Sequence, residues 1–513
     1  MNRESVIIAP LVRPAVCLML GIAAGRFVSW PQWPVLGVLA VFVLLTLLAG
    51  RRELLQSLCL ETACIALGLL LCLHQKEALT VAWPEEDGHW AFVVSSEPTE
   101  RGKTLAMDAL VAETGQKIQL RIMADEQSRQ LTAGDGIIAQ TTLRPLTATG
   151  SYRTYQETHG YVGEAFVTRR HWQHESISLD HIGSGAKVRL FFMQQRHKLL
   201  QQITPNIRER DDYSILAAMT LGDKSAVSRE QKEQFAIAGT SHLLALSGLH
   251  LGIIYMLMTY LFHSRRLRLV NQLLIVGSIW AFVLLVGMPL SVIRAALMIS
   301  IYAFVSMLNR SKTPINTLAL SAVIILLANP YVLFDVGFQL SFASVLAILL
   351  FMPLVTPHRS ARPAGTLARA RTLNTQRSTL NPQPFLYQMT MVSIAAQIGT
   401  APLVAYYFGR FPVWFLLANY VSIPLSYCIL STMLVTLLLG WWPTLQALVL
   451  NIPVTLASWL NSWTQWVASL PFASIDGLHP TMLQTSLAYV IVFCLWYLLR
   501  YRREHEPEKL RKE

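Results

Sequence analysis

Apolar runs close to twenty residues long recur along most of this 513-residue chain. A helix needs about 20 apolar residues to cross the hydrocarbon core of a bilayer. The chain is 53% hydrophobic and 14% charged, with a mean hydropathy of +0.42, whereas soluble domains carry about 25% charged residues. The sequence therefore predicts a mostly α-helical, polytopic membrane protein.

The apolar runs fall into two groups, which together predict about 12 spans. Three spans (11–28, 34–49 and 54–73) make an N-terminal membrane part, residues 1–76. The others form a second bundle over residues 241–500, followed by a basic tail, 501–513; they are expected at 243–262, 270–287, 290–308, 315–329, 335–355, 388–408, 413–439, 445–470 and 481–499. The segment 445–470 contains Pro453 and three tryptophans, so it either crosses fully or lies partly in the interface.

A hydrophilic stretch, residues 77–180, separates the two groups. Short alternating runs, such as Ala91–Val94, Lys117–Ile122 and Gly136–Thr141, are punctuated by Gly and Asp. Period-two patterns of this length predict a small β-barrel or sandwich. Residues 181–240 follow as an amphipathic helix and linker; that helix either lies on the membrane surface or packs on the β domain.

The net charge of +12 is distributed unevenly. Residues 78–180 carry nine Lys and Arg against fourteen Asp and Glu, a net charge of −5. The positive excess lies in alternate short loops of the membrane parts, with Arg26 and Arg410 as exceptions. This bias predicts that both termini are cytoplasmic and that residues 77–240 lie on the other side of the membrane. The assignment of the C-terminus depends on 445–470 crossing fully.

The run from His242 to Gly252 places polar residues and glycines inside a predicted span. Ser247 and His250 are neighbours at i, i+3 on a helix, and Gly248 and Gly252 have the spacing that lets two helices approach closely. These residues either pack helices around a hydrogen-bonded histidine or line a cavity. Intramembrane ionisable groups are candidate functional sites by default.

Further polar side chains interrupt other predicted spans, and we expect them to line the same path. Arg294 and Asp335 form either a buried ion pair or a hydrated vestibule in which the guanidinium meets an anionic substrate. Helix-breaking prolines at 289, 402 and 424 are typical of transport cavities. The remaining candidates for the lining are Gln339, Gln397, Thr400 and Asn419.

Signatures of catalysis and cofactor binding are missing from the sequence. It has no histidine–acid spacing of a catalytic metal site, and His171 and His174 form an isolated pair. No phosphate-binding glycine loop of an ATP-driven motor occurs. All six cysteines lie in apolar stretches, so no disulfide framework is indicated. We expect no catalytic residue, metal or cofactor.

Six motifs in order along the chain resemble the ComEC family of competence proteins. They are Ala217–Asp223, Gly239–His250, Ser291–Ala295, Asn329–Pro330, Gly337–Phe342 and Ala396–Pro402, with looser agreement at 150–160. The resemblance covers nearly the whole chain. It implies a channel of the bacterial inner membrane that carries single-stranded DNA into the cytoplasm during natural transformation.

The resemblance also implies that the periplasmic domain is an OB-like fold that receives DNA. Such folds stack bases on aromatic rings beside a basic groove. The candidates are Trp90, Tyr152, Tyr155 and Tyr161 with Arg121, Arg144, Arg153, Arg169 and Arg170. Because residues 78–180 have a net charge of −5, we expect weak DNA binding by this domain alone.

Many ComEC-type proteins continue into a metallo-β-lactamase-like domain, whereas this sequence stops at Glu513. We therefore expect no hydrolytic activity and infer separate partners: a DNA receptor on the outer side, a cytoplasmic helicase or motor, and a nuclease. Oligomeric state stays open. Two other functions fit the polar bundle: a secondary transporter of a small anion or lipid-linked substrate, and a membrane scaffold that recruits a motor or nuclease.

Overall fold

The structure is a computed structural model that describes residues 9–50, 52–169, 171–178, 183–203, 210–262, 267–307, 313–355 and 382–509. The chain divides into two units. The first comprises Met1–Val227, Ala245–Phe338 and Leu430–Val454, and the second comprises Ser228–Leu244, Gln339–Ile429 and Thr455–Glu513. Each unit is described below by itself.

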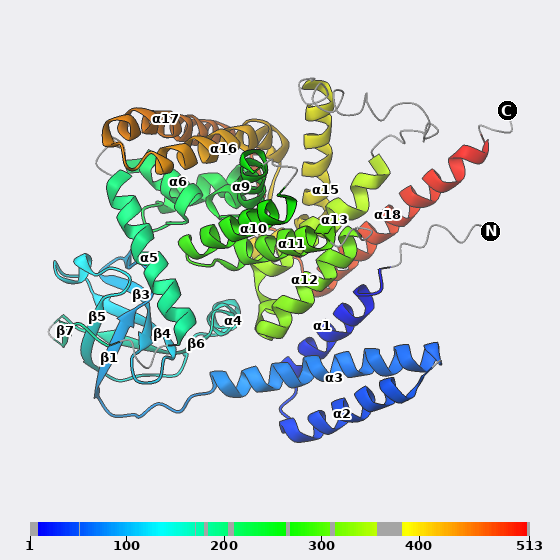
Figure 1. The fold of residues 1–513 in the computed structure, drawn as a ribbon, viewed down its shortest axis with the longest axis horizontal. Coiled ribbons are helices and arrows are strands. Elements are labelled where there is room, and N and C mark those ends of the chain that lie inside the picture. Colours follow the sequence, from blue (N-terminus) through cyan, green and yellow to red (C-terminus); the bar gives the residue numbers. More distant parts are fainter. Residues whose placement is uncertain are drawn as a thin grey trace. The chain divides into compact units, whose positions relative to one another are not determined.

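Three N-terminal helices begin the first unit: α1 (Val12–Phe27), α2 (Gln32–Leu48) and α3 (Glu53–Leu79). Helix α3 packs against both α1 and α2 (Figure 1). Gly21 of α1 lies directly against the carbonyl oxygen of Ile65, and Gly68 of α3 against that of Leu18, so neither position has room for a Cβ. This backbone-to-backbone contact is the packing that small residues permit in membranes.

A mixed β-sheet follows α3, and the predicted alternating runs fall on three of its strands. The sheet order is β6-β4-β3-β1-β5-β7, with β2 paired to β3 and β6 parallel to β4. The strands are β1 (Gly88–Val94), β2 (Thr99–Arg101), β3 (Thr104–Val111), β4 (Lys117–Met123), β5 (Gly136–Thr141), β6 (Tyr161–Val167) and β7 (Trp172–His174).

The sheet does not close, so the predicted small β-barrel is wrong. Its two ends in the strand order, β6 and β7, do not pair with each other. A single bridge between Arg144 and Glu164 connects the residues after β5 to β6. Alternation along a strand predicts a sheet with one buried face, whereas closure depends on strand tilt and stagger, which alternation does not encode.

The two faces of the sheet have different neighbours. One face buries an apolar core that includes Phe92, Leu120 and Ile137. The other face is covered at one place by α5 (Ser184–Ile203), whose Leu190 packs on Val93 and Leu110. Elsewhere on that face lies the short helix α4 (Gly150–Thr158), whose side chains meet Gln119 of β4.

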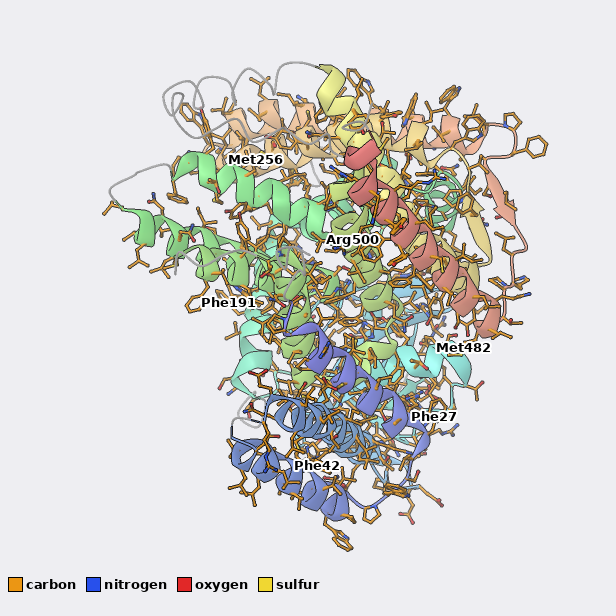
Figure 2. The ribbon with its side chains drawn as sticks, turned by 90° about the vertical axis from the view of Figure 1, so that its right-hand side faces the viewer. Phe27, Phe42, Phe191, Met256, Met482 and Arg500 are labelled. Carbon is orange, nitrogen blue, oxygen red and sulfur yellow. The ribbon has the colours of Figure 1, made fainter. Side chains whose placement is uncertain are left out.

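Helix α5 does not divide simply into a polar exposed face and an apolar buried face. Its Arg196 is buried, whereas its Phe191, labelled in Figure 2, is 56% exposed. The contact of Leu190 with the sheet is the kind of packing that the β-domain alternative describes.

The remaining helices of the first unit form an apolar core around Leu251, Ile279 and Val292. This core joins three helices that follow one another in the chain: α9, α10 and α11. The helical elements in this part are α6 (Arg210–Leu221), α9 (Gly248–Leu261), α10 (Arg268–Leu285), α11 (Leu290–Met307), α12 (Pro314–Ala328) and the 3₁₀ turn η3 (Pro330–Phe334).

The second unit is also mainly helical. Helix α7 (Arg229–Ile237) begins with a capping box between Ser228 and Gln231, and the short α8 (Ser241–Leu244) follows. Ala347, Phe351 and Ala395 form an apolar cluster. The other elements are α13 (Val336–Val355), α15 (Pro382–Phe408), α16 (Phe415–Leu438), α17 (Pro443–Ala468), α18 (Met482–Lys509) and the paired strands β8 (Arg410–Pro412) and β9 (Ser474–Asp476); the unit boundaries cut α13, α16 and α17.

Six helices among the described residues are long and apolar enough to cross a membrane, which indicates a multi-pass membrane protein. Their outward apolar side chains agree: only 6% of the α18 span is buried, and Met482 at its start is 75% exposed (Figure 2). These spans are Glu53–Leu79, Val336–Val355, Phe385–Phe408, Phe415–Leu438, Pro443–Ala468 and Met482–Arg503.

The prediction of about 12 spans is therefore confirmed only in part. Five further apolar helices are shorter, among them Gly248–Leu261 and Pro314–Ala328. At 1.5 Å of rise per residue, the 14 residues of α9 fall short of a full crossing. Asn329 and Pro330 end α12, and the break before Ser247 delays the start of α9. Hydropathy alone does not detect such ends. Residues 445–468 of the uncertain segment 445–470 belong to α17, one continuous helix.

Candidate functional site

The motif around Ser247 marks a break between two helices. Helix α8 ends at Leu244 and α9 begins at Gly248, so the expected continuous helix over 243–262 is wrong. Ser247 caps α9: its Oγ accepts a hydrogen bond from the Leu249 N–H, and the His250 ring lies 3.0 Å away, from Nδ1 to Oγ. Backbone groups at a helix start lack partners within the helix, and these two side chains satisfy them.

Contacts in the first unit hold this break in place. Ser291 at the start of α11 donates a hydrogen bond of 2.6 Å to the carbonyl oxygen of Leu246. Leu246 also packs against Gly222, which has a φ of +75° and follows α6. Three of the quoted sequence motifs, at 217–223, 239–250 and 291–295, therefore meet at Leu246. His250 is completely buried.

Arg294 and Asp335 lie close together, as the ion-pair alternative requires. Arg294 is 3% exposed, and its Nη1 lies 3.9 Å from Asp335 Oδ1. Its Nη2 donates a hydrogen bond of 2.9 Å to the carbonyl oxygen of Gly337. Asp335 Oδ1 also accepts a hydrogen bond of 2.7 Å from the Phe338 N–H, and this bond caps the start of α13. The Asp335 carboxylate is thus shared between the Arg294 guanidinium and the Phe338 N–H, and the shorter of the two contacts is the one to Phe338.

The guanidinium of Arg294 retains donor capacity. Its Nε and Nη1 are buried and have no hydrogen-bond partner in the described part of the chain. A buried donor without a partner costs about 1–3 kcal/mol, and more when it is charged. Guanidinium is the side chain best suited to bind phosphate or carboxylate oxygens in pairs. The arrangement can accept an anion or water, so the ion-pair and vestibule alternatives both remain compatible with it.

The two glycines of the motif are less crowded than their spacing predicts. A Cβ on Gly248 would meet Ala295 Cβ at 3.5 Å, an ordinary contact between α9 and α11. A Cβ on Gly252 would meet no heavy atom of the described residues within 4 Å. Among the described residues, no neighbouring helix packs closely against Gly252, so that part of the prediction stays a prediction.

The other predicted lining residues lie in the second unit. Gln339 on α13 accepts a hydrogen bond of 2.8 Å from the hydroxyl of Tyr407 on α15. Thr400 donates to its own helix at Ala396, and Asn419 on α16 donates to Ser393 on α15 at 3.5 Å. Gln397 Nε2 is buried without a hydrogen-bond partner among the described residues.

A cavity of about 380 Å³ opens on the β domain between α4 and strands β2, β3 and β4. Tyr152 and Tyr155 of α4 are nearly parallel, with ring centroids 6.1 Å apart and an interplanar angle of 12°. His159 continues the row at 4.1 Å from Tyr155. The tyrosines are 37% and 46% exposed. The cavity lining comprises Ser96, Thr99, Arg101, Ala106, Met107, Asp108, Gln119, Tyr152, Tyr155 and Tyr161.

Charges in this cavity are organised around Asp108. Its carboxylate pairs with Lys117 at 2.9 Å and accepts a hydrogen bond from the Tyr161 hydroxyl. Burial lowers the pKa of Lys117 and raises the pKa of Tyr161. Burial likewise raises the pKa of Tyr155, and the negative charges of Asp108 and Asp335 add to that increase.

The predicted DNA-binding residues divide between this surface and others. Arg121 lies beside Phe166 on the face of the sheet that also carries Gln119, and Phe166 is 49% exposed. Arg153 lies on α4 with Tyr155 but pairs with Glu157 at 2.9 Å. Arg144 and Arg169 are exposed beyond the ends of β5 and β6. Arg170 lies outside the described residues.

Arg101, Asp108 and Gln119 were missed by the sequence analysis. Along β3 and β4 the residues of the core face are apolar, so a polar residue at an intervening position marks the opposite face. Asp108 and Gln119 follow that rule and pair directly across the two strands. The alternation contained this signal, whereas the position of α4 over it did not follow from the sequence.

Comparison with known proteins gives the family. Residues 219–503, more than half of the chain, match the family described as competence protein. This chain belongs to the competence protein family. ComE operon protein 3 of Bacillus subtilis (strain 168) is 27% identical over 337 residues, which are 65% of this chain and 40% of the relative. No solved structure matches the chain.

The competence-family match covers both the helix break at Ser247 and the Arg294–Asp335 pair. The β domain with its cavity precedes the matched residues. Among the described residues, no group of three or more His, Cys, Asp or Glu side chains could hold a metal ion.

Proposed function

We propose that this competence-family chain is an inner-membrane channel that carries single-stranded DNA into the cytoplasm during natural transformation. Membership of the competence family implies a role in DNA uptake. The chain spans about 40% of the length of the curated relative it matches, so the substrate and the channel activity are inferences for this chain. The outer β domain would receive the strand.

The observation that carries this proposal is the buried guanidinium of Arg294. It is 3% exposed, and two of its nitrogens lack hydrogen-bond partners among the described residues. A buried cation with unused donors would attract the phosphates of the strand one after another. Because Asp335 lies 3.9 Å away, its carboxylate would compete with each phosphate for the guanidinium. Conduction requires such moderate binding, because a trapped phosphate would block the path.

The test is a charge reversal at Arg294 in a naturally competent strain that lacks the chromosomal copy. Arg294→Glu is expected to abolish import of labelled DNA while the protein stays in the membrane. Arg294→Lys keeps the positive charge but loses the paired donors, and it should retain partial import. Arg52→Glu changes an exposed arginine at the start of α3 and serves as the control. Normal transformation with Arg294→Glu contradicts the proposal.

The same strain separates the two other functions. A transporter of a small anion would leave transformation intact when the chain is deleted. A scaffold that only recruits a motor or nuclease would keep wild-type import in the Arg294/His250/Gln339 triple alanine variant. We infer that a DNA receptor, a cytoplasmic helicase or motor and a separate nuclease act with this chain, which we propose is not itself an enzyme.

A further inference from the structure

We propose that a clamp on η3 holds Asp335 apart from Arg294, and that the β domain sets this clamp through α4. The clamp comprises Arg26, Glu157, Thr158 and Asn329. The inference rests on the proposed function, because it makes anion binding at Arg294 depend on the β domain. Asp335 directly follows η3, and its carboxylate lies 3.9 Å from the Arg294 guanidinium. Contacts that fix η3 therefore also fix the carboxylate that competes for Arg294.

The gap between these two charges requires a restraint. Hydrogen-bonded ion pairs have N–O distances of about 2.7–2.9 Å, whereas Nη1 of Arg294 and Oδ1 of Asp335 are 3.9 Å apart. Nη1 and Nε of the guanidinium are buried and have no hydrogen-bond partner among the described residues. Opposite charges attract more strongly in a buried site than in water. An unrestrained carboxylate would therefore close on these donors and occupy them.

Helix α4 holds the start of η3. Asn329 caps this turn, because its Oδ1 accepts a hydrogen bond of 3.0 Å from the Tyr331 N–H. The amide nitrogen of the same side chain donates a hydrogen bond of 3.0 Å to the carbonyl oxygen of Thr158, the last residue of α4. The Thr158 hydroxyl donates in turn to the Tyr331 carbonyl oxygen at 3.4 Å. One residue of α4 thus binds both the cap and the first turn of η3.

Helix α1 holds the other end of η3. The Arg26 guanidinium lies over the rings of Tyr331 and Phe334, at 5.4 and 5.3 Å from their centroids. A cation and an aromatic ring attract each other at this distance, and Phe334 is the residue before Asp335. Glu157 of α4 orients the guanidinium through an ion pair of 2.6 Å. Loss of that carboxylate would leave Arg26 free to turn away from the rings.

The position of α4 depends in turn on the β-sheet. Tyr152 and Gln156 of α4 both donate hydrogen bonds to Gln119 Oε1 of β4, at 3.0 and 3.1 Å. Gln156 is completely buried there. A continuous series of contacts therefore runs from β4 through α4 and η3 to Asp335, and such a series can carry coupling between distant parts of a protein. A shift of α4 would release the clamp and let Asp335 pair directly with Arg294, which would withdraw the guanidinium from phosphates.

The first test is a double-mutant cycle between Arg294→Gln and Asp335→Asn, measured by the unfolding midpoint of the purified full chain in detergent. The cycle isolates the interaction of these two side chains, and it is repeated in the Glu157→Gln background. Release of the clamp should make the interaction about twofold larger, because a direct charge-assisted hydrogen bond would replace the 3.9 Å contact. Ile118→Val removes one methyl group from the core on the other face of the sheet, and in this control background the interaction should not change.

An interaction that is unchanged or weaker in the Glu157→Gln background overturns the clamp. A purely structural loss of α4 packing gives Arg294 and Asp335 no reason to attract each other more strongly, so this readout separates the two roles of Glu157.

Import of labelled DNA is the second test. Glu157→Gln should lower import by roughly 5- to 150-fold, the usual range of coupling between two sites. Glu100→Gln, which removes an exposed pair with Arg129, should import as the wild type does. Wild-type import in Glu157→Gln also overturns the inference. The channel proposal then stands if Arg294→Glu abolishes import, and it fails together with the clamp if Arg294→Glu imports normally.

Discussion

Arg26 at the end of α1 and Glu157 on α4 form an ion pair with an Nη1–Oε2 distance of 2.6 Å, which joins the first helix to the β domain. The guanidinium also lies over the rings of Tyr331 and Phe334, at 5.4 and 5.3 Å from their centroids. Arg26 was an exception to the charge bias of the loops, and its neighbours explain why. Arg410, the other exception, pairs with Glu233 and Asp476 at 2.6 Å each.

Glu157→Gln should therefore weaken the attachment of α4 to α1. Glu157 is 12% exposed in its side chain and also pairs with Arg153. Removing its charge leaves Arg26 partly buried without a counter-ion, and we expect a loss of about 1–3 kcal/mol. The thermal unfolding midpoint of the purified chain in detergent measures this loss. Glu100→Gln removes the exposed pair with Arg129 and should change stability by less than about 1 kcal/mol.

A double-mutant cycle separates the pair from the individual side chains. Arg26→Gln combined with Glu157→Gln should cost less than the sum of the two single changes, because the second change removes a partner already lost. Additive losses would mean that the two groups do not interact in solution.

Stability should fall as the pH rises through the titration of Glu97. Burial raises the pKa of this carboxyl above its usual 4.5, although His197 and Arg196 oppose the increase. A carboxyl with a raised folded-state pKa stabilises the fold in its protonated form. That contribution is complete below the unfolded-state pKa and is lost as the pH passes the folded-state pKa.

Glu97→Gln removes this titration and provides the check. The variant should be more stable than the wild type at neutral pH, and the difference should shrink towards acid pH. Glu126→Gln changes an exposed carboxyl of the same β domain and is the control. The unfolding midpoints of both proteins are measured across the acid range. A difference between the wild type and Glu97→Gln that does not change with pH would contradict this prediction.

The loss of the Asp335 side chain should have two separable effects. Asp335 pairs with Arg294 and also accepts the Phe338 N–H at the start of α13. Asp335→Asn keeps an oxygen acceptor for the helix cap and loses the charge, whereas Asp335→Ala loses both. The alanine variant should be less stable than the asparagine variant by about 1 kcal/mol, the usual value of a cap. Equal unfolding midpoints for the two variants would show that the cap contributes nothing.

The sequence predicted local patterns well and three-dimensional relationships only in part. The alternating runs became β1, β4 and β5, and the pair of Arg294 and Asp335 was anticipated as one alternative. The sequence did not predict that the sheet is open, because closure depends on strand tilt. The break at Ser247 is a further example: a serine followed by glycine and a histidine at the third position is a helix start, but the apolar run around it predicted a continuous span.

Glycine packing shows the same limit. The sequence analysis assigned close approach to Gly248 and Gly252 from their spacing. Among the helical glycines, the structure instead has the closest backbone contacts at Gly21 and Gly68 between α1 and α3, and at Gly399 on α15. Spacing identifies a face of small residues on one helix, whereas contact depends on what the facing helix presents at that height. No pattern within a single helix contains that information.

Gly399 and Gly252 therefore make a matched pair of substitutions. A Cβ on Gly399 would lie 2.6 Å from both the Ala343 carbonyl oxygen and the Ala347 Cβ of α13. Gly399→Ala should destabilise the second unit by about 1–3 kcal/mol through overpacking. Gly252→Ala meets nothing within 4 Å among the described residues, and it should stabilise α9 by up to about 1 kcal/mol through helix propensity.

Both variants are compared by unfolding midpoint in detergent and by transformation frequency. We expect Gly399→Ala to lower both quantities and Gly252→Ala to leave transformation at the wild-type level. If Gly252→Ala is the more damaging change, its neighbour in the membrane must be a helix that approaches it more closely than the described contacts indicate. The spacing prediction would then be correct, and the helix packing described here would have to be revised at α9.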